Sequence, residues 1–399
     1  MTWNEEELAF IKALWENENS LSWMDVADQV GAKFKKEANP EAVRSAYRRW
    51  RDVGFTGADE TTLNRVKQAR SAQKRSSHNA RTLRLLLDAR EDEQLVLERI
   101  KEIVAKVGKV KTPKPPKKYP NRFPMVMELL LSDLHFGKLV KEDNEPCFNE
   151  KIARNRLKQV TSVFLKELHM AQKHYNVERI VVALLGDMIE SFEMHNIESA
   201  RGCEYGTAKQ IWACIDALLF EVFLPLAETG IHIDVPAVTG NHDRSERKRT
   251  YENPGENNWT YIIYKTLESM LVGRGYKNVK FIIPASPYCT LDIFGYTVLY
   301  EHFDNVRGAS RESFDKLMRK RGRQLGRMVD MMRGGHFHEY NMYGNGEVIV
   351  NGSLSGSDSF ADVIGYKSEP CQVLNYYLDI PGKVGKKKKF HKTFGIELE

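Results

Sequence analysis

Five short polar blocks lie within 206 residues of this chain, and each contains side chains that can bind metal ions. In chain order they are Asp133-Leu134-His135, Gly186-Asp187, Gly240-Asn241-His242-Asp243, His302 and Gly335-His336-Phe337-His338. Carboxylate, imidazole and carboxamide groups suit hard to borderline divalent ions such as Mn, Fe or Zn, whereas thiolates would indicate another metal chemistry. No cysteine belongs to the set. The blocks supply enough ligands for two metal ions.

Each of these residues has an ordinary explanation when it is taken alone. Asp133 can cap a turn, Asp187 can occupy a Gly-Asp turn, and His302 can be a buried core histidine. The ordered set resists that explanation, because burying seven polar groups without partners costs a large amount of free energy. We therefore predict a metal centre formed by Asp133, His135, Asp187, Asn241, His302, His336 and His338.

Apolar runs lead into four of the five blocks, which indicates how the blocks are positioned. The runs are residues 125–132, 180–185, 231–238 and 297–301. They alternate with helical patterns at about residues 149–175, 208–226 and 259–272, and this alternation predicts a layered α/β domain. Ligands in such domains collect where loops leave the carboxyl ends of strands, so the blocks can converge on one edge.

The order of the five blocks resembles the calcineurin-like metallophosphoesterase family, whose pattern is Asp-x-His, Gly-Asp, Gly-Asn-His-Asp/Glu, a lone His and Gly-His-x-His. The resemblance covers roughly residues 125–379 and implies a β-sandwich flanked by helices. It implies that Asp133, His135 and His338 bind one divalent ion, that Asn241, His302 and His336 bind the other, and that Asp187 bridges both. Mn is the metal we expect, with Fe, Zn and Ni as alternatives.

The same resemblance implies the chemistry of the blocks. A hydroxide shared by the two ions attacks the phosphorus atom, and His242 stabilises or protonates the leaving oxygen. The alternative interpretation of His242 is a further ligand or a support for its loop. We expect Asp243 to share the catalytic role, and Asp243 or Glu190 to orient His242 or the groups behind the ligands. Family members often have Asp where Glu190 stands, so a standard Asp-His pair is not assured by the sequence.

A helical pattern occupies residues 1–52 and bears on the substrate. Three short helices are predicted: the second follows Ser22, and the third begins at Asn39-Pro40 and shows basic side chains on its outward face. These basic residues are Arg44, Arg48, Arg49 and Arg51. The pattern resembles a helix-turn-helix module of the Myb or homeodomain-like kind, which implies DNA contact. A small helical domain whose arginines are solvated or touch the catalytic body remains the alternative.

Positive charge is concentrated between the two predicted domains. Residues 1–60 carry a net charge of −4, residues 61–124 carry +11, and the remainder carries −1. We predict a helix-turn-helix-like domain at 1–52, a basic linker at 53–124 with a helix at about 81–107, a catalytic domain at 125–382 and a lysine-rich tail at 383–399. Arg244 and the basic residues after it either follow a phosphate backbone or form a solvated loop.

The five cysteines are odd in number and widely spaced, so we expect reduced thiols. The beginning of the sequence lacks the pattern of a secretory signal and no long apolar run is present, so we expect no membrane span and a cytoplasmic location. The partners that we expect are DNA and, as an option, a second copy of the chain.

Joined to the helical module, the motifs resemble the DNA-repair exonuclease branch of the SbcD type and predict a two-metal DNA phosphodiesterase. The chain has no segments that require the ATPase partner of that branch. One alternative is a phosphatase or nucleotide phosphodiesterase whose N-terminal module serves assembly. The other is a DNA-binding regulator without catalysis, which the intact ligand set disfavours.

Overall fold

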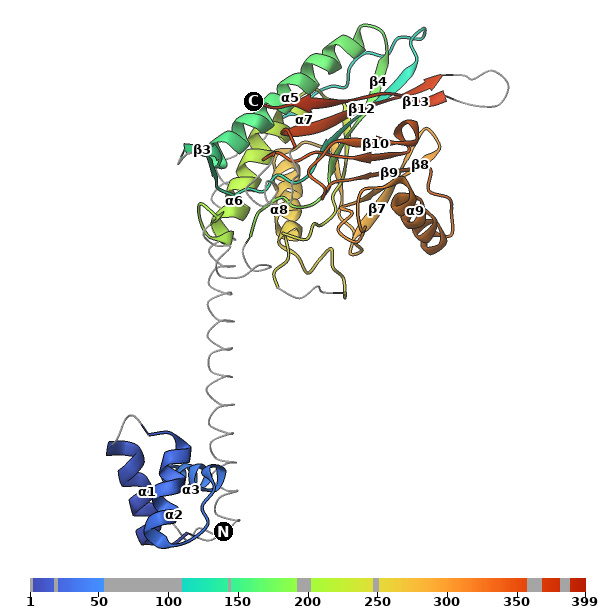
Figure 1. Cartoon of the computed structure of the whole chain (residues 1–399). Coiled ribbons are helices and arrows are strands. Elements are labelled where there is room, and N and C mark those ends of the chain that lie inside the picture. Colours follow the sequence, from blue (N-terminus) through green and yellow to red (C-terminus); the bar gives the residue numbers. More distant parts are fainter. Residues whose placement is uncertain are drawn as a thin grey trace. The chain divides into compact units, whose positions relative to one another are not determined.

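The computed structural model describes residues 3–17, 21–53, 110–142, 145–191, 202–246, 251–356, 368–380 and 388–399. The chain divides into two compact units, Met1–Glu93 and Gln94–Glu399 (Figure 1). The helix predicted at about residues 81–107 lies outside the described residues.

Three helices form the described part of the first unit: α1 (Glu5–Asn17), α2 (Trp23–Phe34) and α3 (Pro40–Val53). Ser22 and Asp25 form a reciprocal capping box at the start of α2, and the Asn39 side chain accepts a hydrogen bond from the Ala42 amide at 2.7 Å. Apolar side chains from all three helices meet in one small core, with Ile11, Val26 and Val43 fully buried. The predicted small helical unit is confirmed.

Two β-sheets form the centre of the second unit (Figure 1). The first sheet has the order β13-β12-β1-β4-β5-β6, with strands β1 (Pro124–Leu131), β4 (Asn176–Leu184), β5 (His232–Pro236), β6 (Val279–Ile282), β12 (Cys371–Ile380) and β13 (Lys388–Glu397). The second has the order β10-β11-β9-β8-β7, with β7 (Tyr288–Ile293), β8 (Tyr296–Glu301), β9 (Met331–Gly334), β10 (Asn341–Tyr343) and β11 (Val348–Val350). β1, β4, β5 and β6 run parallel, and β12 and β13 join antiparallel. A short hairpin of β2 (Val140–Glu142) and β3 (Glu145–Phe148) lies outside these sheets.

Helices cover the outer faces of the two sheets, which gives a layered sandwich (Figure 1). The first sheet packs against α5 (Glu150–Gln172), α6 (Thr207–Ala217), η2 (Leu218–Phe223), α7 (Leu224–Ala227) and α8 (Trp259–Arg274). The second sheet packs against α9 (Arg311–Leu325). Alternate residues of one strand serve different layers: Leu129 faces the helices while Leu130 packs between the sheets. The predicted α/β sandwich flanked by helices is confirmed.

One helical stretch in the described part of the chain is long and apolar enough to cross a membrane. It is Thr207–Ala227, with a mean hydropathy of 1.6, and 67% of its most apolar window is buried in the protein. Ile211, Cys214 and Phe223 from this stretch belong to the core between the helices and the first sheet.

The structure corrects the prediction of a lysine-rich tail. Residues 388–397 form β13, which pairs with β12 at the edge of the first sheet. Phe394, Ile396 and Leu398 alternate with polar residues and pack on the core, and this alternation is the sign of a strand. The lysines obscured it, although lysine is common on edge strands because its charge prevents pairing with other chains.

The proline-rich end of the predicted linker is attached to the second unit. The Val110 amide donates to the Arg274 carbonyl at 2.8 Å, and the Arg122 guanidinium donates to the Gln172 carbonyl at 2.6 Å. Residues 110–119 form no helix or strand, as their proline content predicts.

Candidate metal centre

Loops at the ends of strands carry every residue of the predicted ligand set. Asp133 and His135 follow β1, Asp187 follows β4, and His302 directly follows β8. Asn241 lies beyond β5, and His336 and His338 lie beyond β9, so both sheets contribute. The first two loops are joined by backbone hydrogen bonds, from the Asp133 amide to the Gly186 carbonyl and from the His135 amide to the Asp187 carbonyl, each 3.1 Å long.

Two glycines allow these loops to approach one another. Gly186 has a φ of +89°, a conformation that residues with a Cβ rarely adopt. A Cβ on Gly186 would lie 2.5 Å from the Gly240 amide nitrogen, so the two loops pack backbone against backbone. The glycines in the sequence blocks therefore serve close packing rather than ligand binding.

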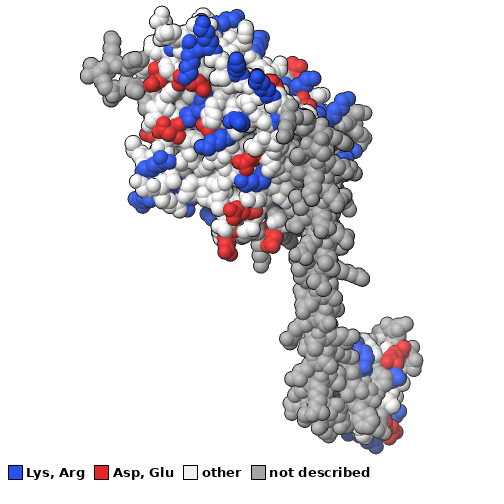
Figure 2. All heavy atoms as spheres, turned by 180° about the vertical axis from the view of Figure 1, so that it is seen from behind, with Lys and Arg blue, Asp and Glu red and all other residues white. Residues whose placement is uncertain are grey.

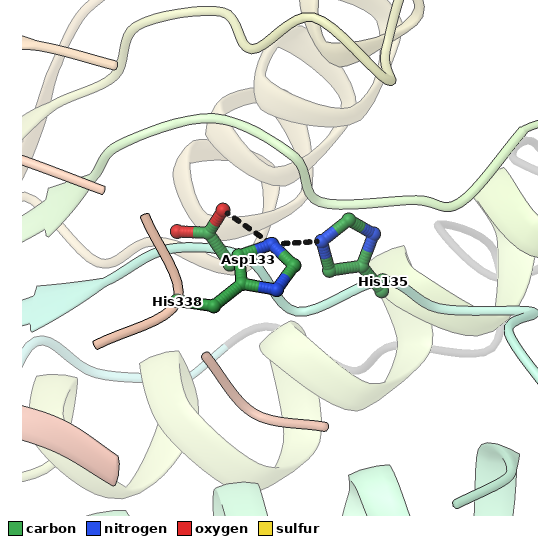
Figure 3. Close-up of side chains that lie close together, drawn as sticks. All are labelled: Asp133, His135 and His338. Atoms are coloured by element: carbon green, nitrogen blue, oxygen red, sulfur yellow. Dashed lines mark hydrogen bonds and ion pairs between the residues drawn. The ribbon is translucent and has the colours of Figure 1, made fainter. Parts of the chain in front are cut away.

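Asp133, His135 and His338 form the first group of candidate ligands, as shown in Figure 3. The Nε2 atoms of His135 and His338 lie 3.1 Å apart, and His338 Nε2 lies 3.3 Å from Asp133 Oδ1. The potential ligand atoms all lie within 4.8 Å of one another. Asp133 and His135 are fully buried, and the His338 side chain is 27% exposed, so the group opens to solvent on the side of His338.

Asp187, His302 and His336 form a second group of the same size. His302 Nε2 lies 3.0 Å from Asp187 Oδ2 and 3.2 Å from Asn241 Oδ1, which brings the carboxamide into the group. His302 Nδ1 lies 2.7 Å from the Leu185 carbonyl, an acceptor that keeps the proton on Nδ1 and leaves Nε2 available to a cation.

The two groups are neighbours. The His336 amide donates to both carboxylate oxygens of Asp133, at 3.1 and 3.0 Å. All seven predicted ligands thus lie together, although they come from five separate loops.

The protonation states in the centre suit metal binding. Burial lowers the pKa of His135 and of His336 to about 4, so both rings are neutral at physiological pH. Burial raises the pKa of Asp133, but the neighbouring His338 and His302 outweigh it and bring the value to about 2. Burial lowers the pKa of His302, but the Asp187 carboxylate outweighs it and raises the value to about 10. A cation would replace the proton of His302.

Backbone strain is concentrated in the same residues. The φ angles are 53° for Asp133, 47° for His135, 53° for Asp187, 77° for His336 and 59° for His338, all in the left-handed region. Each costs roughly 1 kcal/mol or more for a residue with a Cβ. Five such residues among seven candidate ligands indicate that the fold forces these side chains inward for a purpose other than stability.

Glu190 supports the first group from behind. Its Oε2 atom lies 2.6 Å from His135 Nδ1 and 3.7 Å from His242 Nδ1. Neither His135 Nδ1 nor Glu190 Oε2 makes a well-oriented hydrogen bond, although both atoms are buried. A cation on His135 Nε2 would fix the ring proton on Nδ1, where the carboxylate can accept it. The residues present therefore fit a divalent ion. The sequence left open which group Glu190 orients, and in the structure its carboxylate lies nearest to His135.

His242 lies beside the first group. Its ring is perpendicular to that of His135, with the centroids 4.7 Å apart. The His242 amide donates to Asp187 Oδ1 at 2.8 Å, and Nδ1 lies 3.1 Å from the Glu190 carbonyl oxygen. Burial lowers the pKa of His242, but the Asp187 and Glu190 carboxylates raise it above its ordinary value.

Asp243 was predicted to share the catalytic role, and its surroundings suit the orienting role that the sequence offered as well. Its fully buried carboxylate accepts hydrogen bonds from the amides of Asp187 at 2.7 Å, Gly240 at 3.0 Å and Ile189 at 3.2 Å. Both oxygens are therefore directed at backbone. Asp243 is a positioning residue that holds the Asp187 loop against the Asn241 loop.

The basic residues predicted to contact DNA have different surroundings. On α3, Arg48 and Arg51 are exposed and Arg44 is half-buried, while the Arg49 side chain lies outside the described part. Arg244 is paired with Asp304, with Arg244 Nη2 3.0 Å from Asp304 Oδ2. Sequence reasoning missed Asp304, whose position two residues after His302 was the available signal.

Comparisons with known proteins find likenesses among solved structures. No protein-family model matches the chain, and no curated protein matches it. An archaeal phosphodiesterase shares 12% identity, with 68% of this chain and 99% of that chain covered and a TM-score of 0.31. Zinc-bound Vps29 from Entamoeba histolytica shares 13% identity over 68% and 98%, with a TM-score of 0.28. A protein from Streptococcus pneumoniae described as a predicted phosphoesterase shares 12% over the same proportions, with a TM-score of 0.26.

Proposed function

We propose that this protein is a metal-dependent phosphoesterase that uses two divalent cations, with Mn the expected metal, to cleave phosphodiester bonds in DNA. One observation carries the enzymatic part of the proposal: seven oxygen and imidazole ligands from five loops meet in two adjacent groups. Asp133, His135 and His338 would hold one ion. Asn241, His302 and His336 would hold the other, with Asp187 shared between them.

Two divalent ions held in this way would polarise the phosphoryl oxygens and lower the pKa of a water molecule between them. Residues of the chain itself would protonate the leaving oxygen and orient the side chain that does so. His242 donates a proton to the leaving oxygen, since nearby carboxylates raise its pKa and thereby favour the protonated ring. The Glu190 carbonyl, 3.1 Å from Nδ1, fixes the orientation of that ring.

The choice of DNA is supported by charge outside the metal centre. Arg48 and Arg51 are exposed on α3, the third helix of a three-helix unit, where a recognition helix of a helix-turn-helix module would lie. Residues 61–124 add a net charge of +11. The face of the second unit in Figure 2 shows Lys and Arg interspersed with Asp and Glu, without one dominant sign.

Hydrolysis assays test the proposal directly. The full chain is freed of metal with a chelator, supplied with Mn, and incubated with bis(p-nitrophenyl) phosphate, p-nitrophenyl phosphate and labelled DNA. We expect Mn-dependent cleavage of the diester and of DNA, and its loss in Asp187→Ala. Cleavage of the small esters without cleavage of any DNA would overturn the choice of DNA. Absence of all cleavage with Mn, Fe, Zn and Ni would overturn the enzymatic proposal.

A further inference from the structure

Two cavities lie side by side, one against the loops of the metal centre and the other against α9. A small cavity of about 30 Å³ is lined by Gly240, Arg244 and Asp304, which flank the Asn241 and His302 loops. A larger cavity of about 600 Å³ is lined by residues that include Tyr251, Asn305 and Lys320. Pro254 and Pro287 line both cavities, so the two cavities are neighbours. The larger volume is typical of a ligand site, which occupies roughly 300–1,000 Å³.

The lining of the larger cavity suits an anion. Among the described residues that line it, two are basic and none is a carboxylate. Arg321 is committed to the fold: it is 5% exposed, contacts the Glu301 carboxylate with Nε at 2.7 Å, and lies over the Tyr288 ring at 4.2 Å. Lys320 is exposed, and within the described part of the chain no carboxylate forms an ion pair with it. Lys320 is thus the cation in the cavity that remains available to a ligand.

An exposed aromatic ring completes the cavity. The Tyr251 side chain is 86% exposed, so its ring is open to solvent. Asn253, Ser286 and Asn305 line the same cavity. The Ser286 hydroxyl donates to the Tyr288 carbonyl and Asn305 Nδ2 donates to Glu301, so Ser286 and Asn305 offer a ligand their oxygen acceptors. An aromatic face, a cation and neutral hydrogen-bonding groups in one groove form the combination that binds single-stranded nucleic acid, with a base stacked on the ring and a phosphate on the cation.

We propose that this groove holds the single-stranded DNA that leads into the metal centre, with Lys320 binding a backbone phosphate and Tyr251 stacking on a base. The proposal rests on the function proposed above and names the part of the substrate that lies beyond the cleaved bond. Arg244 lines the smaller cavity and is paired with Asp304, 3.0 Å away.

Two measurements on the full chain test the proposal. Binding of labelled single-stranded DNA is followed by fluorescence anisotropy in a chelator, and the rate of DNA cleavage with Mn is divided by the rate of bis(p-nitrophenyl) phosphate cleavage. We expect Lys320→Glu to weaken binding about tenfold, to reduce the slope of log affinity against log salt by about one, and to lower the rate ratio about tenfold. Tyr251→Ala should weaken binding about fivefold or more, whereas Tyr251→Phe keeps the ring and should retain binding.

Lys166→Glu is the charge-matched control, because Lys166 is exposed on α5 and lines none of the cavities described. Equal binding and equal rate ratios in Lys320→Glu, Tyr251→Ala and the control would overturn the proposal. Lys320-dependent binding in a protein that cleaves neither substrate would support the groove and refute the phosphoesterase. Hydrolysis of the small ester without any binding of single-stranded DNA would refute the groove and leave the phosphoesterase standing.

Discussion

Removal of the Glu190 side chain is expected to weaken metal binding without unfolding the protein. Glu190 Oε2 is the carboxylate oxygen 2.6 Å from His135 Nδ1, and His135 is fully buried. In Glu190→Ala the Nδ1–H group of a metal-bound His135 loses its acceptor, and a buried donor without a partner costs about 1–3 kcal/mol. Because the Glu190 side chain is 16% exposed, water can reach the space that it leaves, which favours the lower half of that range. We expect Mn affinity to fall about 5- to 30-fold.

Titration calorimetry of the metal-free protein with Mn measures this change. Glu190→Gln retains the size of the side chain and a carbonyl acceptor, so it should recover most of the affinity, whereas Glu190→Asp is too short to keep the 2.6 Å contact. Glu268→Ala on α8 removes a partly exposed carboxylate paired with Lys265 and serves as a control. If Glu190→Ala melts like the parent and binds Mn within twofold of it, Glu190 does not hold His135.

Three further predictions concern groups around the centre. Asp243→Ala leaves three buried amides without their acceptor, so the free energy of unfolding in urea should fall by about 3 kcal/mol or more, and a loss under 1 kcal/mol would contradict the positioning role. The pKa of His302 is raised to about 10, so its ring is protonated at pH 7. Mn binding should therefore release about one proton, and the Mn affinity should rise as the pH rises from 6 to 8. Calorimetry in buffers of different ionisation enthalpy measures the proton release, and a value of zero would refute the prediction. Glu128→Ala leaves the fully buried Arg333 guanidinium, 3.0 Å from the carboxylate, without its charge partner, so unfolding should become about 3–5 kcal/mol easier, with partial recovery in the Glu128→Gln plus Arg333→Met double variant.

The strands and the ligand loops could be predicted from the sequence because their signals are local. An apolar run such as residues 125–132 shows a buried strand, and the polar residues that follow mark its end. The predicted helix at residues 259–272 corresponds to α8, with Asn258 capping its first turn. Residues 388–397 were misread because four lysines near the start of β13 masked the alternation of Phe394 and Ile396.

Side-chain partners within the centre could not be predicted in the same way. Asp243 ends a Gly-Asn-His-Asp block, where a carboxylate next to a histidine suggests catalysis. Only the fold shows that its oxygens face three amides. Glu190 is 55 residues from His135, and the contact between them depends on how the first two loops pack. Neither the composition nor the periodicity of the sequence predicts how these loops pack.

The left-handed backbone conformation of five candidate ligands lowers the stability of the fold in order to place side chains in the metal centre. Each of these left-handed conformations costs roughly 1 kcal/mol or more of folding free energy. The five residues together cost an amount comparable to the net stability of a typical domain, about 5–15 kcal/mol; they are Asp133, His135, Asp187, His336 and His338. Glycine adopts such a conformation without that cost. A laboratory selection for heat resistance alone would therefore favour glycine at these positions and give a more stable but inactive protein. A selection that alternated heat resistance with hydrolysis would retain all five residues.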